Sequence, residues 1–106
     1  MSRPIPPATA ADHPLLVDLY ELTMAQAYWH EGMASEEAVF SLYFRTLPEH
    51  RNYVLACGLA DVLRYLTELR FTPDHLAYLE TLGHFTPGFL EWLGDLRFTC
   101  DAWALP

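Results

Sequence analysis

The chain has 106 residues, 52% hydrophobic and 14% aromatic, which is enough for one packed domain and excludes an intrinsically disordered chain. Its formal net charge of −8 comes from 14 acidic residues and 6 basic ones, so nucleic acid and anionic membrane surfaces are not expected as partners. No apolar run reaches the roughly 18 residues that a membrane-spanning helix needs, and the N-terminus does not resemble a secretory signal.

The first part of the chain predicts a leader followed by a helix. Residues 1–13 are rich in Pro and Ala, and we expect them to be a flexible leader. Residues 14–31 contain few helix breakers and carry apolar residues at helical spacing, so they predict a helix that ends at Gly32. We take residues 14–106 as one domain.

Two starts for this first helix are compatible with the sequence. In one, Asp12 is the N-cap and Pro14 lies in the first turn. In the other, Asp18 is the N-cap and Glu21, three residues later, completes a capping box. A helix that is broken near Val17 and Asp18 would accommodate both starts.

Two segments are predicted to be β-strands. Residues 37–45 alternate between two faces, and the face with Phe40, Leu42 and Phe44 is expected in the core. Residues 98–105 form the second candidate strand. The short apolar run at residues 53–56 fits either a strand or the approach to a helix.

Three helices are predicted between these strands. Residues 58–69 carry an apolar stripe opposite charged residues. Thr72 and Thr86 are each followed by a proline, which is typical of an N-cap and first helical position, and glycines at 83 and 94 end the two short helices. With a helix, a strand, three helices and a strand in order, the fold class is predicted to be α+β.

The cysteines and histidines give no sign of a metal site. Cys57 and Cys100 have no pairing motif, so we expect a reduced cytoplasmic chain in which both thiols are small core residues. The five histidines are scattered and lack metal-ligand spacing. We therefore expect no metal ligand in this chain.

The segment after Asp18 is the best candidate for ligand binding. Tyr20 and Thr23 are three apart, so the ring and the hydroxyl share a helix face, and a tyrosine at a helix start can stack on a flat ring. Arg45, at the end of the first predicted strand, suits a carboxylate or a phosphate. The alternatives are simple capping with an interface tyrosine, and a surface salt bridge for Arg45. No residue fits a catalytic role.

The order of short motifs resembles the N-terminal portion of the nicotinate phosphoribosyltransferases, which are type II phosphoribosyltransferases. The resemblance covers nearly all of residues 15–106, and no single motif carries it alone. The motifs, in chain order, are Asp18-x-Tyr20-x-x-Thr23-Met24 with Tyr28-Trp29, Phe40-x-x-x-Phe44-Arg45-x-x-Pro48, Tyr53 followed by Gly58-Leu59, Tyr78-Leu79, Phe89-x-x-x-Leu93 and Phe98-x-x-Asp101.

The resemblance implies an α/β barrel-like enzyme when complete. It implies that nicotinate and phosphoribosyl diphosphate give nicotinate mononucleotide and diphosphate, with ATP hydrolysis and Mg²⁺, in cytoplasmic NAD salvage. It also implies a homodimer in which Tyr20 lies against the pyridine ring and reaches into the neighbour's site. For Thr23 and Arg45 the resemblance implies only weaker contacts with the substrate.

The resemblance further implies that the chain is truncated at its C-terminal end and is inactive alone, because the phosphate-binding parts of the family are not in it. Two other interpretations remain open. The chain could be a small acidic protein-interaction module, or a relative of the nicotinamide or quinolinate phosphoribosyltransferases.

Overall fold

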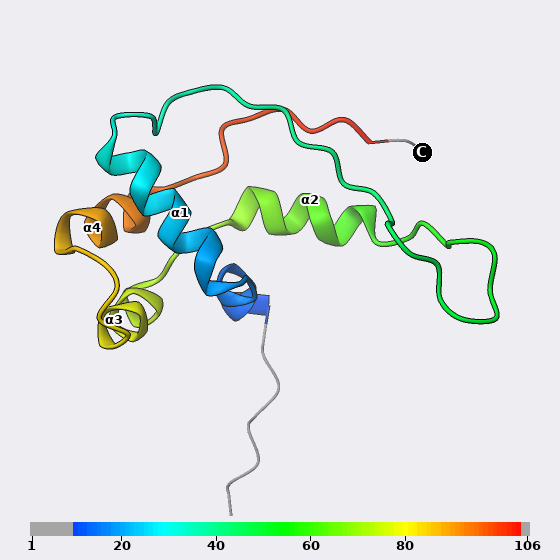
Figure 1. Ribbon diagram of the computed structural model, residues 1–106, viewed down its shortest axis with the longest axis horizontal. Coiled ribbons are helices and arrows are strands. Elements are labelled where there is room, and N and C mark those ends of the chain that lie inside the picture. The colour runs from blue at the N-terminus through cyan, green and yellow to red at the C-terminus, as the bar shows by residue number, and fades with distance from the viewer. Residues whose placement is uncertain (1–9, 105–106) are drawn as a thin grey trace, which may run out of the picture.

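The computed structural model describes residues 10–104, and all regular structure in that range is helical (Figure 1). No helix within it is long and apolar enough to cross a lipid bilayer. The predicted leader lies outside the described residues up to residue 9, and its last residues belong to a 3-10 helix. The elements are η1 (Ala10–Leu15, the 3-10 helix), α1 (Leu19–His30), α2 (Leu59–Glu68), α3 (Pro73–Thr81) and α4 (Pro87–Asp95).

The caps of α3 and α4 confirm the predicted helix starts. The Thr72 hydroxyl accepts a hydrogen bond from the backbone N–H of His75 at 3.3 Å, and the Thr86 hydroxyl accepts one from Phe89 at 3.4 Å. A proline follows each cap, where its missing N–H is not needed. Gly83, after α3, has a φ of +73°, the left-handed conformation that the predicted glycine stop requires.

The hydrophobic core lies between α3 and α4. Phe89 is fully buried, and its ring is stacked against those of Phe85 and Trp92, with centroids 5.8 Å away in each case. Helix α1 and η1 add partly buried side chains to this cluster, so the core is a small one assembled on a pair of short helices. Its buried hydrophobic members are Phe71, Leu79, Phe89, Leu90 and Leu93.

The first helix is broken, as one reading of the sequence allows. Helix η1 ends at Leu15, three residues follow without helical structure, and α1 starts at Leu19. The prediction of a continuous helix from Pro14 is therefore wrong. Its predicted end is confirmed, because α1 stops at His30 and Gly32 has a φ of +73°.

Helix α2 also forms where it was predicted. Gly58 is its N-cap residue in a left-handed conformation, with a φ of +97°. Its apolar side chains are only half-buried: Leu59, Val62 and Leu63 remain 47–48% exposed. The stripe predicted from the sequence is therefore present, but the described part of the chain does not cover it.

Neither predicted strand forms within residues 10–104. Residues 37–45 are extended and unpaired within the described structure, and Phe40, Leu42 and Phe44 are 90%, 97% and 67% exposed, so the prediction that this face is core is wrong here. The described part of the segment at 98–105 is also unpaired. A strand needs a neighbour for its ladder of hydrogen bonds, and these segments leave the helical body (Figure 1). The strands of the α+β prediction are thus not confirmed.

The dimensions and the cysteines agree with this picture. The Cα radius of gyration is 16.6 Å, compared with about 13 Å for a compact domain of this length. Cys57 and Cys100 are both exposed and unpaired, so the prediction that they are core residues is wrong. Both lie outside the helices, Cys57 directly before the N-cap Gly58 of α2 and Cys100 at a bend after α4.

Candidate functional site

The start of α1 holds the polar residues that the sequence singled out. Asp18 is the N-cap residue, with φ −73° and ψ 146°, and its carbonyl accepts the first backbone hydrogen bond, from Glu21 N–H at 3.1 Å. Its carboxylate makes no capping bond, so the predicted capping box between Asp18 and Glu21 is wrong. Both carboxylates are exposed at the positive end of the helix dipole, which stabilises their charge.

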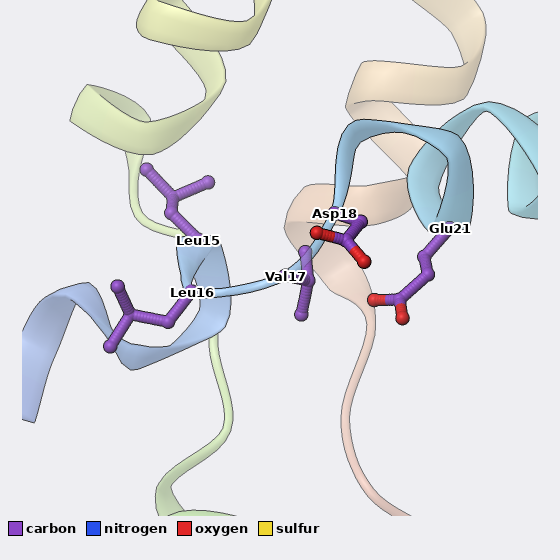
Figure 2. Close-up of a pocket in the computed structure, with 5 residues that line it drawn as sticks. All are labelled: Leu15, Leu16, Val17, Asp18 and Glu21. Atoms are coloured by element: carbon purple, nitrogen blue, oxygen red, sulfur yellow. The ribbon is translucent and has the colours of Figure 1, made fainter.

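An open concavity lies at the break between η1 and α1 (Figure 2). It is lined by three apolar residues of the break and by the two acidic residues, namely Leu15, Leu16, Val17, Asp18 and Glu21. The two carboxylates lie on the same side of the α1 start in this view. No cation pairs with them within residues 10–104, so the concavity is negative and unsuited to a phosphate or diphosphate group.

Tyr20 projects from the first turn of α1 and is 60% exposed. Its backbone carbonyl accepts a hydrogen bond from the Thr23 hydroxyl at 3.0 Å, and its phenol makes no hydrogen bond within the described residues. The ring and its hydroxyl are therefore free to contact a flat ligand. The Thr23 hydroxyl has its proton engaged in the helix, so it can offer a ligand only an acceptor.

Arg45 is not brought to this helix. It lies on the extended segment between α1 and α2, and within residues 10–104 no hydrogen bond or ion pair joins it to another side chain. The salt bridge considered as its alternative role is also absent there. The structure thus unites Tyr20 and Thr23 and leaves Arg45 apart from both.

His75 is a buried polar residue that the sequence analysis missed. It is 6% exposed, and its ring Nδ1 accepts a hydrogen bond from Thr72 N–H at 3.0 Å, completing a capping box with His75 in the place usual for Glu or Gln. Its Nε2 lies 3.5 Å from a carboxylate oxygen of Asp12, which ties η1 to α3. The sequence feature that could have identified this role is a histidine three residues after Thr72, the N-cap of a Thr-Pro helix start.

The described residues do not form a metal centre. Within residues 10–104, no three His, Cys, Asp or Glu side chains lie close enough together to hold a metal ion. This part of the molecule therefore offers no group of three such ligands for the Mg²⁺ that the sequence resemblance implies. What the start of α1 can do is orient a flat ring without transferring a proton to it.

Comparison with known proteins identifies a family. The model of the nicotinate phosphoribosyltransferase (NAPRTase) N-terminal domain matches residues 15–106. Nicotinate phosphoribosyltransferase pncB2 of Mycobacterium tuberculosis is 54% identical over 92 residues, covering 87% of this chain and 20% of that protein. The human nicotinate phosphoribosyltransferase is 40% identical over 93 residues, covering 86% of this chain and 17% of the human protein.

A third relative extends the range of organisms. The nicotinate phosphoribosyltransferase of Bacillus subtilis is 39% identical over 66 residues, covering 62% of this chain and 14% of that protein. The chain thus spans a fifth or less of the length of these three relatives. No solved structure matches it.

Proposed function

Since this chain belongs to the nicotinate phosphoribosyltransferase family and matches its N-terminal domain, we propose that the whole protein joins nicotinate to phosphoribosyl diphosphate. The products are nicotinate mononucleotide and diphosphate, and ATP hydrolysis drives the reaction in cytoplasmic NAD salvage. The observation that carries this proposal is the family match over residues 15–106, which includes the Tyr20 segment.

The reaction sets a positioning problem that this domain can help to solve. The lone pair of the pyridine nitrogen forms a bond to the anomeric carbon of the ribose, and the bond from that carbon to diphosphate oxygen breaks, so diphosphate leaves with the electron pair. No proton moves at the ring nitrogen. Rate enhancement then depends on aligning the ring with the sugar and on stabilising the developing charges.

We assign the alignment of the ring to Tyr20. Its side chain is largely exposed at the start of a helix and has no other polar partner within residues 10–104, which suits it to stack on the pyridine ring. Thr23 is assigned a weaker role as an acceptor on the same helix, and Arg45 a weaker one as a contact for an anion or for a second subunit.

The negative concavity beside Tyr20 favours a shared site. Asp18 and Glu21 would repel phosphoribosyl diphosphate, so the cations that bind this substrate must come from elsewhere in the enzyme. We propose a homodimer in which Tyr20 faces the pyridine ring held in the partner's site. The Mg²⁺ and ATP of the reaction are assigned to other parts of the enzyme, because residues 10–104 supply no ligand set for the metal.

Steady-state kinetics of the full-length enzyme test this proposal. Tyr20→Ala is expected to raise KM for nicotinate about tenfold, while KM for phosphoribosyl diphosphate is unchanged. Tyr20→Phe is expected to raise KM for nicotinate by less, because it keeps the aromatic ring. The matched control is Tyr78→Ala, since Tyr78 is 55% exposed but lies on α3. An unchanged KM for nicotinate in Tyr20→Ala would disprove the assignment.

Assays with alternative bases decide the substrate. The full-length enzyme is expected to form product with nicotinate and not with nicotinamide or quinolinate. Product formation with either of those two bases at a higher kcat/KM would place the protein in a related phosphoribosyltransferase group.

A further inference from the structure

Gln26 connects α1 to the turn between α3 and α4 through both ends of its side-chain amide. Its Nε2 donates a hydrogen bond to the carbonyl oxygen of His84 at 2.9 Å, and its Oε1 accepts one from the backbone N–H of Thr86 at 2.8 Å. The partners lie 58 and 60 residues further along the chain. Because one partner only accepts and the other only donates, a single orientation of the amide satisfies both.

The turn that Gln26 binds is itself held in place. Thr86 is the N-cap residue of α4, and its hydroxyl also accepts from Phe89 N–H. The same hydroxyl lies 3.5 Å from Gln26 Oε1 and 3.5 Å from Nε2 of His30, the last residue of α1. The cap of α4 and the second half of α1 are thus joined by one small group of polar atoms.

The Gln26 hydrogen bonds restrict the rotation of α1 about its own axis more tightly than the apolar packing of this helix does. Leu22, Ala25 and Trp29 pack against the core, but no residue of α1 is fully buried, so apolar packing alone restricts the rotation of α1 about its axis only in part. Two directional hydrogen bonds from one side chain restrict that rotation further. Gln26 and Tyr20 are six positions apart, which separates them by about 120° around the helix axis.

We propose that Gln26 is a positioning residue for nicotinate, because it sets the rotation of α1 and so the direction in which Tyr20 points. The inference rests on the proposed function, in which Tyr20 holds the pyridine ring. Gln26 does not touch the substrate. Its effect reaches the ring only through Tyr20, on the side of α1 that faces away from the core.

Two variants of the full-length enzyme test the proposal. Gln26→Met removes both hydrogen bonds while keeping the length of the side chain, and it is expected to raise KM for nicotinate about fivefold with KM for phosphoribosyl diphosphate unchanged. Gln26→Glu keeps the acceptor for Thr86 N–H and loses the donor to His84, so a smaller rise is expected. If the methionine variant does not fold, the glutamate variant carries the test.

A control variant separates positioning from stability. Leu82→Ala removes a partly buried side chain from the core and is expected to lower Tm without changing KM for nicotinate. A rise of KM in Leu82→Ala equal to that in Gln26→Met would overturn the proposal, because loss of stability alone would then account for it.

A double-mutant cycle shows whether Gln26 acts through Tyr20. In the Tyr20→Ala background, Gln26→Met is expected to cause no further rise in KM for nicotinate. A full fivefold rise in that background, or no rise in the Gln26 variants alone, would refute the positioning role and leave the proposed function intact. An unchanged KM in Tyr20→Ala alone would instead refute both the positioning role of Gln26 and the assignment of Tyr20 to the pyridine ring, and it would leave the proposed reaction intact.

Discussion

The indole of Trp29 on α1 lies so close to Gly88 on α4 that a Cβ atom at that glycine would come within 3.1 Å of the ring. The same indole meets the ring of Phe89 edge to face, with the centroids 6.0 Å apart. Because Gly88 has no side chain, it leaves room for the Trp29 indole and allows α1 to approach α4. This contact and the Gln26 hydrogen bonds both join α1 to the α3–α4 pair.

A leucine at position 88 should detach α1 and leave the rest of the core folded. Gly88→Leu places a side chain where Trp29 lies, and overpacking of this kind costs about 1–3 kcal/mol. We expect amide hydrogen exchange in α1 to accelerate about tenfold or more, while exchange in α3 changes little. Glu91→Leu, an exposed position on α4, is the matched control. Equal acceleration in α1 and α3 would contradict the prediction.

The cap of α3 makes a separate prediction. Thr72→Ala removes the hydroxyl that accepts from His75 N–H and is expected to lower the free energy of unfolding by about 1 kcal/mol. Thr72→Ser keeps the hydroxyl and is expected to unfold close to the wild type. Urea unfolding followed by far-UV circular dichroism measures both variants, and equal losses in the two would show that the hydroxyl is not the stabilising group.

The exposed apolar segment makes the third prediction. Val39, Phe40 and Leu42 have almost no contacts in the described structure, so the 106-residue chain should bind a hydrophobic dye and self-associate. The triple variant V39T/F40S/L42S is expected to lower dye fluorescence and to change the free energy of unfolding by less than about 0.5 kcal/mol. Light scattering reports the association.

The opposite response is expected from a core position. Phe85→Ser loosens the stack on Phe89, so it should raise dye fluorescence and lower stability. A triple variant that unfolds as readily as Phe85→Ser would mean that residues 39–42 are packed in solution.

The fourth prediction concerns activity. The 106-residue chain incubated with nicotinate, phosphoribosyl diphosphate, ATP and Mg²⁺ is expected to form no nicotinate mononucleotide, because the residues around Tyr20 are acidic and offer no cation for the diphosphate. Chromatographic separation of the nucleotide from nicotinate measures the product, with the full-length enzyme as positive control. Product above the level of a protein-free reaction would contradict it.

Local features of the fold could be predicted from the sequence. The caps at Thr72 and Thr86 and the stop at Gly83 each depend on a few neighbouring residues, so their residue types are sufficient to locate them. The family was also recognisable from the order of short motifs. The exposure of Tyr20 agrees with its expected place at a helix start, although its contact with nicotinate stays a prediction.

Features that depend on distant partners could not be predicted. The alternation in residues 37–45 is typical of a strand, but a strand also requires a neighbour, and none is present within residues 10–104. The role of Gln26 could not be predicted from its neighbours in sequence, because the turn it binds lies about 60 residues away. The capping box at Asp18 failed because the spacing permits that hydrogen bond without enforcing it.

The separation of Gln26 and Thr86 in sequence also affects the order in which the helices can pack during synthesis. At ribosomal speeds of about 5–20 residues per second, the 60 residues between them take roughly 3–12 seconds to synthesise. Helix α1 therefore emerges well before the α3–α4 pair on which it rests, whereas α3 and α4 are neighbours that can pair at once. The indole of Trp29 on nascent α1 therefore stays uncovered until Gly88 and Phe89 have been synthesised.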